Sequence, residues 1–167
     1  NVVDVQCSSQ SCHALKNDAT VTSWGSAFMV DHGADLTNVA SITCGSLVCA
    51  ALKFDGTAVT WGSDFFGANA TGVHGVDLTD VADVSCGGGA CVARRNDGTA
   101  SAWGYSDMGG DASGVDLTDV ADISCGGGPH YPTGFACAAL KYNGSAEVWG
   151  TAAYGGVAPG VDLTANI

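Results

Sequence analysis

Cysteine is the reactive residue type with the most regular spacing in this chain. Eight of the 167 residues are cysteine, and they fall in four successive pairs. The pairs are Cys7 and Cys12, Cys44 and Cys49, Cys86 and Cys91, and Cys125 and Cys137. The last pair has a longer intervening segment yet keeps both cysteines, which favours a disulfide across the loop between two antiparallel strands. A zinc site is the weaker interpretation, because thiolates from separate pairs would have to converge on one ion, so we assign no metal ligand.

Aspartate also recurs, at intervals of three residues, within residues 77–83 and 116–122. In an extended strand such carboxylates lie about 10 Å apart, which is too far for one calcium ion unless the chain turns. Aspartate in a turn also hydrogen-bonds its own backbone. We therefore expect the repeated carboxylates to serve the scaffold and assign no cofactor, with calcium binding kept as an alternative.

A catalytic acid or base is needed once, so it is sought among residues that do not repeat. The histidines are His13, His32, His74 and His130, and they occupy different places without forming a spaced metal motif. No acid–base pair stands apart from the repeated pattern. The sequence therefore predicts no enzyme activity, and a hydrolase with one carboxylate near the centre of the repeats is the weakest alternative.

These residues belong to a unit that occurs four times within a single domain, residues 1–167. The opening phrases VVDVQC, VASITC, VADVSC and VADISC begin units that span residues 2–38, 39–80, 81–119 and 120–165. Each unit continues with a second cysteine, an Ala-containing phrase, a turn and Trp-Gly, and closes on Asp-Leu-Thr. A period of about 40 residues is typical of propeller blades or helical arrays.

The local chemistry favours strands over helices. Residues 39–44 alternate small or apolar side chains with Ser and Thr, which is the period of a strand. The Asp-Gly and Asn-Gly pairs at 55–56, 97–98 and 143–144 suit tight hairpin turns. The sequence thus predicts an all-β, β-propeller-like fold with four blades of about 37–46 residues, each with three strands and a short fourth around Asp-Leu-Thr.

The ordered pattern V-x-x-I-x-C-G, then A-L-K-x-D-G, then W-G and a Gly-rich loop resembles the repeat of the regulator of chromosome condensation family, here as a disulfide-containing secreted variant. The resemblance implies β-propellers of about seven blades, and the family includes a nucleotide-exchange factor and a secreted β-lactamase inhibitor. Four repeats fit a closed small ring, an arc of a larger propeller, or half of a ring that a partner chain completes. We expect closure of some kind, within the chain or between chains, because an open arc exposes strand edges. Closure within the chain would pair the segment ending at Thr164 in the first repeat.

Charge and cysteine content narrow the partners and the compartment. The formal net charge of −12 disfavours nucleic acid and anionic membrane surfaces. Disulfides persist in oxidising compartments, which predicts an extracellular or cell-surface location through the secretory route, or another oxidising lumen such as the thylakoid lumen. Asn69 and Asn143 lie in glycosylation sequons.

Binding residues are expected where the repeats differ from one another, because variable loops on a rigid scaffold carry most binding functions. The candidates are the insertion residues His130 and Tyr131 and the aromatic residues that follow Trp-Gly, which are Phe65, Phe66, Tyr105 and Tyr154. The sequence predicts a non-catalytic structural module that binds a protein partner or self-assembles within an extracellular or lumenal assembly. A glycan- or calcium-binding surface is the alternative, and a secreted enzyme inhibitor is a weaker one.

Overall fold

The protein is described by a computed structural model that covers residues 1–26, 33–72, 75–126 and 135–164. It contains four antiparallel sheets of three strands each, with consecutive strands paired in every sheet. The strands are β1 Val2–Cys7, β2 Ser11–Lys16 and β3 Val21–Gly25; β4 Val39–Cys44, β5 Val48–Lys53 and β6 Ala58–Gly62; β7 Val81–Cys86, β8 Ala90–Arg95 and β9 Ala100–Gly104; β10 Val120–Cys125, β11 Ala136–Lys141 and β12 Ala146–Gly150. The all-β class predicted from the repeats is confirmed.

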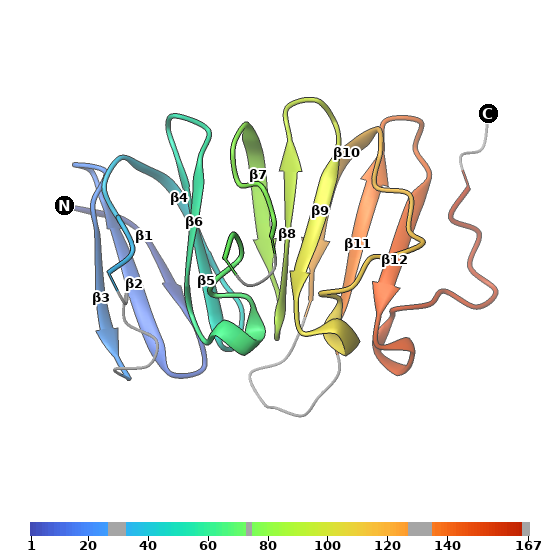
Figure 1. The fold of residues 1–167 in the computed structure, drawn as a ribbon, viewed down its shortest axis with the longest axis horizontal. Coiled ribbons are helices and arrows are strands. Elements are labelled where there is room, and N and C mark those ends of the chain that lie inside the picture. The colour runs from blue at the N-terminus through green and yellow to red at the C-terminus, as the bar shows by residue number, and fades with distance from the viewer. Residues whose placement is uncertain (27–32, 73–74, 127–134, 165–167) are drawn as a thin grey trace.

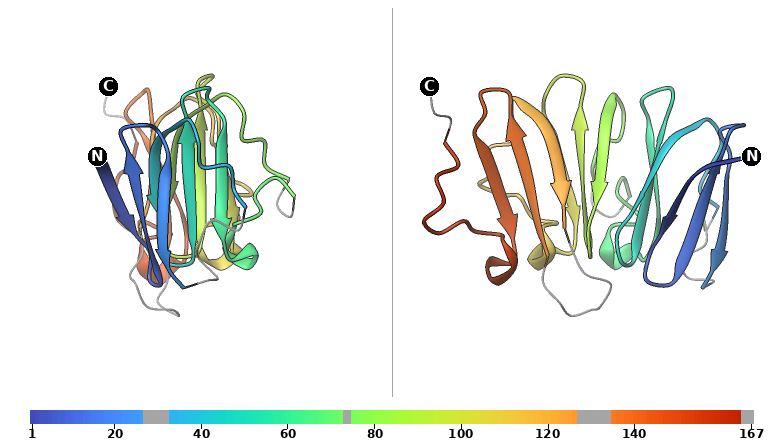
Figure 2. Two further views of the ribbon diagram at one scale, coloured as in Figure 1. Left: turned by 90° about the vertical axis from the view of Figure 1, so that its left-hand side faces the viewer. Right: turned by 180° about the vertical axis from the view of Figure 1, so that it is seen from behind.

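The four sheets stand side by side in an open row rather than a closed ring (Figure 1; Figure 2). The first sheet lies at one end of the row and the fourth at the other. The expected closure within the chain is wrong. The segment that was expected to pair in the first sheet instead bonds its own sheet, where the Ala146 N–H donates to the Leu163 carbonyl at 2.9 Å.

The short fourth strand expected around Asp-Leu-Thr is absent from the described residues. The leucine carbonyl of each Asp-Leu-Thr phrase accepts one backbone hydrogen bond from the first residues of the third strand of its sheet, as Leu78 does from Ala58 at 2.9 Å. No further strand pairing follows this bond in the described residues. The aspartate of the Asp-Leu-Thr phrase prevents a fourth strand from forming. Asp77 Oδ1 accepts bonds from both the backbone N–H and the hydroxyl of Thr79, at 3.0 and 2.8 Å, and this turn bends the chain away from an extended strand.

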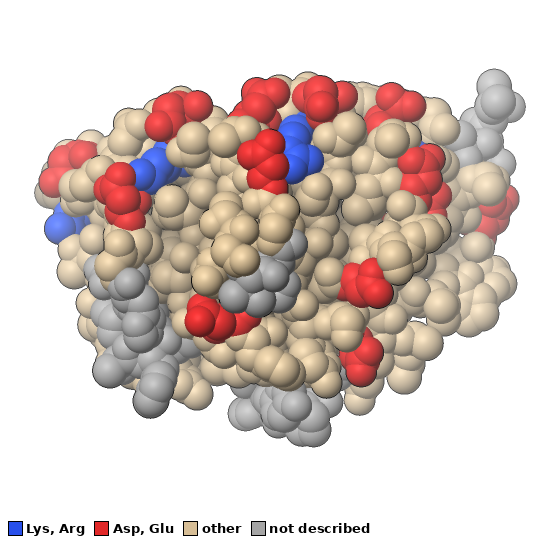
Figure 3. Space-filling view, in the orientation of Figure 1, with Lys and Arg blue, Asp and Glu red and all other residues tan. Residues whose placement is uncertain are grey.

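The hairpin turns between second and third strands follow the chemistry expected of them. Gly56 and Gly98 have φ of 80° and 81°, and Asp55 Oδ1 accepts the Thr57 N–H at 2.9 Å. In the first sheet Ala19 takes the same left-handed conformation, with φ of 62°. These turns lie along one edge of the row, where acidic side chains gather (Figure 1; Figure 3).

The core lies between the sheets. Trp61, Val39 and Ile42 of the second sheet pack against Leu15 and Leu36 of the first. Two further clusters repeat this arrangement between the second and third sheets and between the third and fourth. We call the face of a sheet that carries its tryptophan the leading face and the opposite side the trailing face. Every interface thus joins one leading face to the trailing face of the preceding sheet.

Three single-turn 3-10 helices follow the Trp-Gly phrases. They are η1 Asp64–Phe66, η2 Ser106–Met108 and η3 Ala152–Tyr154. None of the helices in the described part of the chain is long and apolar enough to cross a membrane.

Candidate functional site

Within the described ranges, aromatic side chains cluster at the loops that follow the second and third Trp-Gly phrases. The rings of Phe65 and Tyr105 lie 4.8 Å apart between centroids, and Phe66 meets Phe65 edge-to-face at 5.1 Å. Phe65 is exposed and Tyr105 half-buried, whereas Phe66 belongs to the core cluster between the second and third sheets. We call Phe65 and Tyr105 the aromatic rim.

The rim is held in place by a hydrogen bond between neighbouring sheets. The Trp103 indole N–H donates to the Gly67 carbonyl at 3.1 Å, which fixes the η1 loop against the third sheet. Gly67 has φ of 105°, and a Cβ there would lie only 2.9 Å from Trp103 Cδ1, so glycine is required. The rim is therefore a preformed apolar surface on a rigid support. The exposed carboxylates Asp64 and Asp107 lie in the same two loops and add negative charge.

The other residues predicted to bind a partner do not belong to the aromatic rim. Phe66 fills the gap between sheets, so it supports the rim from beneath and offers little surface to a partner. Tyr154 takes the place of Phe66 in the fourth sheet and is exposed there, at the end of the row. His130 and Tyr131 lie outside the described residues.

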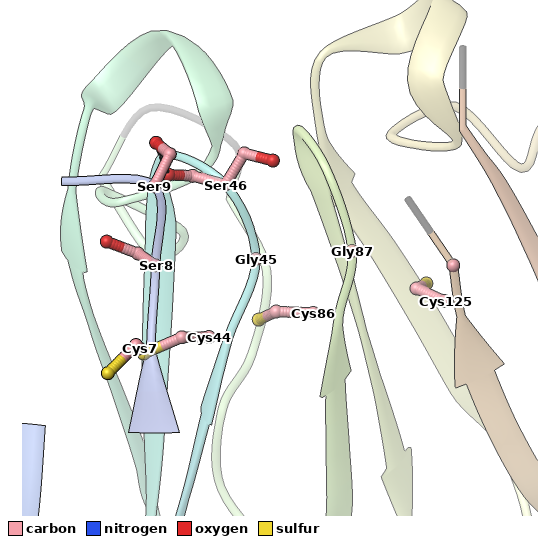
Figure 4. A pocket seen from close by; sticks show the side chains of 10 residues that line it. Cys7, Ser8, Ser9, Cys44, Gly45, Ser46, Cys86, Gly87 and Cys125 are labelled. Carbon is pink, nitrogen blue, oxygen red and sulfur yellow. Dashed lines mark hydrogen bonds between the residues drawn. The ribbon is translucent and has the colours of Figure 1, made fainter. Parts of the chain in front are cut away.

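A hollow of about 380 Å³ lies where the first strand of each sheet ends (Figure 4). We call these four strands, β1, β4, β7 and β10, the inner strands. Its lining consists of cystine, serine and glycine residues, and Ser9 Oγ donates to the Ser46 carbonyl across it at 2.6 Å. Neighbouring inner strands are also joined, because the Cys125 N–H donates to Ser85 Oγ at 2.9 Å. None of the lining residues carries an acid, a base or a free thiol, so the hollow can offer hydrogen bonds but no acid–base or nucleophilic chemistry.

Disulfides are present in every sheet. They join Cys7 to Cys12, Cys44 to Cys49, Cys86 to Cys91, and Cys125 to Cys137. Each joins the end of the inner strand to the facing position of the middle strand, with Cα atoms 4.0 to 4.1 Å apart. Because paired cysteines have no thiolate to offer, the group formed by His13, Cys44 and Cys49 is not a metal site in this oxidised state.

His13 has a structural role that its position in the sequence did not reveal. It is fully buried, and its two ring nitrogens lie 2.8 Å from Ser11 Oγ and from Ser23 Oγ. Its ring also meets Trp61 of the next sheet edge-on, with centroids 5.2 Å apart. The available signal was the strand register, which pairs His13 with Ser23 once the hairpin is placed.

The repeated carboxylates bond residues of the scaffold. Lys53 pairs with Asp35 at 2.6 Å and Lys141 pairs with Asp116, and each lysine lowers the pKa of its carboxyl group to about 2, helped by a threonine hydroxyl. Asp83 differs, because burial raises its pKa. Asp83 has Arg94 directly opposite in the sheet and bonds the Val84 N–H at 2.8 Å, so it is engaged within the sheet.

This geometry defines a class of fold, a row of propeller blades that each contain one disulfide. No protein-family model matches the chain, and no curated protein matches it in sequence. Several solved structures share its fold. Human WBSCR16 matches with a TM-score of 0.69 and 21% identity over 99% of this chain and 50% of its own. The ectodomain of the Physcomitrella patens receptor kinase CR4 matches with a TM-score of 0.66 and 17% identity over 89% of this chain and 41% of its own.

Yeast Prp20p, whose crystal structure was described together with its binding to Gsp1p and histones, matches with a TM-score of 0.65 and 18% identity over 90% of this chain and 45% of its own. A second structure of this protein names it yeast RCC1, bound there to Kap60. The resemblance of the repeats to the regulator of chromosome condensation family is thus confirmed at the level of the fold. This chain spans about half the length of these structures.

Proposed function

We propose that this chain is a non-catalytic protein-binding module of an extracellular or lumenal assembly, folded as one repeat domain over residues 1–167. The observation that carries the proposal is the aromatic rim, an exposed phenylalanine stacked near a tyrosine on loops anchored by buried tryptophan. Exposed aromatic side chains held rigidly are favoured at protein interfaces, because they bury a large area with little loss of conformational entropy.

Two further observations support protein binding. The described hollow at the inner strand ends holds no titratable group, so it gives a hydrolase no residues to use. Structures with this fold include Prp20p, described with its binding to Gsp1p and histones, and the ectodomain of a receptor kinase. The acidic side chains around this chain favour a partner surface with positive charge around an apolar centre.

The oxidising compartment is supported by the disulfides, which reducing cytosol does not maintain. Asn143 lies exposed in a hairpin turn, where its Oδ1 accepts the Ser145 N–H at 2.9 Å. Asn69 is also exposed. We propose both as glycan attachment sites, since their side chains are accessible to a transferase, and glycan removal followed by mass spectrometry tests this directly.

The test of the binding function uses a photo-crosslinking residue placed at the rim. The chain carries benzoylphenylalanine in place of Ser106, the exposed residue next to Tyr105 in the second rim loop, and is incubated with secreted or cell-surface proteins of its source. We expect one crosslinked protein, whose binding weakens about tenfold or more in Phe65→Ala, as truncation of an interface anchor does. Phe54→Ala is the matched control, because Phe54 is a similarly exposed phenylalanine in the hairpin turn at the opposite end of its sheet.

Equal binding by wild type, Phe65→Ala and Phe54→Ala would refute the rim as the contact surface. A glycan array probed with and without calcium separates the alternative. Calcium-dependent glycan binding that survives Phe65→Ala would replace the proposal with a lectin function.

A further inference from the structure

The rings of the aromatic rim lie close enough together for one cation to contact both. The centroids of Phe65 and Tyr105 are 4.8 Å apart with their planes tilted by 37°, and the side chain of Phe65 is 60% exposed. A guanidinium or ammonium group is attracted to the face of an aromatic ring when it lies within about 6 Å of the ring centroid. A single positive charge above the rim can meet this condition for both rings at once.

Carboxylates in the same two loops strengthen this preference for positive charge. Asp64 directly precedes Phe65 at the start of η1, and Asp107 follows Tyr105 by two residues within η2; both aspartates are exposed. A purely apolar surface that covered the rings would also remove water from the neighbouring carboxylates without replacing their hydrogen bonds, which costs free energy. A cationic group would replace that water with a charge-assisted hydrogen bond.

The rim receives no lysine or arginine from this chain. All five such residues occupy the last one or two positions of a middle strand, β2, β5, β8 or β11; they are Lys16, Lys53, Arg94, Arg95 and Lys141. These positions lie at the ends of the sheets next to the hairpin turns, whereas η1 and η2 lie at the opposite ends (Figure 1). In Figure 3 the basic side chains appear only in the half of the molecule that holds the hairpin turns. A lysine or arginine on the rings therefore has to come from outside residues 1–167.

Arginine fits this surface better than lysine does. Its guanidinium group is planar and weakly hydrated, so it stacks on aromatic faces, and its fork of N–H donors matches the geometry of a carboxylate. Its methylene stem adds apolar contact with the rings beneath. Lysine carries a compact and strongly hydrated charge, which gains less from stacking.

We propose that the aromatic rim binds an arginine side chain of a protein partner. The guanidinium group stacks on Phe65 and Tyr105. Its N–H groups donate to the carboxylate of Asp64 or Asp107. The buried ring of Phe66 lies 5.1 Å and 6.1 Å from the centroids of the two rim rings, so the surface is formed before the partner arrives. This inference rests on the proposed protein-binding function and names the partner residue that the rim takes.

The first test is an NMR titration of the oxidised chain with a short peptide that carries one arginine between glycines and serines, at physiological ionic strength. We expect the signals of Phe65 and Tyr105 to shift before those of the acidic hairpin turns, whose charges salt screens. The matched peptide carries citrulline, which has nearly the shape of arginine and no charge, and it should bind about fivefold more weakly. Equal binding of the two peptides, shifts confined to the hairpin turns, or no shift up to about 10 mM peptide would overturn the proposal.

Variants separate the aromatic face from its apolar bulk. Phe65→Leu keeps a large apolar side chain but removes the ring, so it should weaken binding of the arginine peptide about fivefold. Asp107→Asn keeps the shape and removes the charge, so it should weaken binding about twofold. Phe54→Leu and Asp97→Asn are the matched controls, because Phe54 and Asp97 are exposed in hairpin turns, and both variants should bind as the wild type does. Rim variants that melt at the wild-type temperature and bind the peptide with undiminished affinity would overturn the proposal.

The crosslinked partner distinguishes a failure of this inference from a failure of the binding function. If the rim takes an arginine, Phe65→Leu should weaken partner binding at least about fivefold, since leucine cannot replace the ring face. Binding that weakens in Phe65→Ala but not in Phe65→Leu would overturn the inference and leave the rim as an apolar binding surface. Binding that is unchanged in Phe65→Ala would refute the binding function at the rim, and this inference with it.

Discussion

The third and first sheets each have three strands, one disulfide and one tryptophan at equivalent positions. They differ in which neighbouring residues cover them. The third sheet is packed on both sides, with Val81 and Trp103 on its leading face and Val92 on its trailing face almost completely buried. The first sheet buries its trailing face through Leu15 and His13 while Val2, Val5 and Trp24 stay accessible. A repeated residue therefore has no fixed energetic value. Its contribution depends on whether a neighbouring sheet covers it.

The largest difference between the two sheets is expected at the tryptophan. Trp103→Ala should lower the free energy of unfolding by about 3–5 kcal/mol, because it leaves a cavity and an unpaired Gly67 carbonyl. Trp24→Ala should cost less than about 1 kcal/mol in the dilute single chain, where half of the ring is already in water. Urea unfolding at low protein concentration measures both, and equal losses would contradict the comparison.

Disulfide removal should separate chain entropy from packing. The loops closed by Cys7–Cys12 and Cys86–Cys91 have the same length, so each pair of Cys→Ser substitutions should cost about 2 kcal/mol through the unfolded state. Cys91 is fully buried and Cys12 is not, so the interior pair should cost about 1 kcal/mol more for the buried hydroxyl. Thermal melting under non-reducing conditions checks this order.

A smaller contrast is expected at the glycines that follow the tryptophans. Gly67→Ala and Gly155→Ala share the cost of a left-handed alanine, about 1 kcal/mol. Only Gly67→Ala also brings a Cβ within 2.9 Å of Trp103, whereas the nearest atom at Gly155 is Ala136 Cβ at 3.7 Å. Gly67→Ala should therefore destabilise the dilute chain more, and an equal loss would show that the loop, rather than the neighbouring sheet, decides the cost.

The smallest effect concerns the lysine-paired carboxylates. The pKa of Asp35 and of Asp116 is lowered to about 2 in the folded chain, from an ordinary value of 3.8. A group with a lowered folded pKa stabilises the fold above its unfolded value, so stability should fall as the pH drops from about 4 to about 2. Asp162, in the last repeat, has only Thr164 to lower its pKa. Carboxyl NMR titration should therefore find Asp162 protonating at a higher pH than Asp35 and Asp116.

The parts of the fold that depend only on residues adjacent in the chain could be predicted from the sequence. Asp55 and Gly56 specify a hairpin turn by themselves, and the alternation in residues 39–44 specifies a strand. The fourth strand was mispredicted because Asp77 and Thr79 form a turn that outweighs the pattern of the segment. Closure within the chain was mispredicted because it depends on how sheets are placed relative to one another, which no short segment encodes.

The candidate site was predictable only in part, for the same reason. Phe65 and Phe66 are adjacent and chemically identical, and only the position of the third sheet makes one exposed and the other buried. Tyr154 was selected as an isolated aromatic residue, yet its significance comes from its equivalence to Phe66 and Met108. Burial of His13 likewise required the register with Ser23 and the proximity of Trp61.

The most direct measurement of the relation between burial and neighbouring sheets is small-angle X-ray scattering of the oxidised chain over a dilution series. At low concentration the account predicts one 16.6 kDa chain with the shape of an open row of four sheets. The distance distribution of a closed ring with a central opening at low concentration would contradict it.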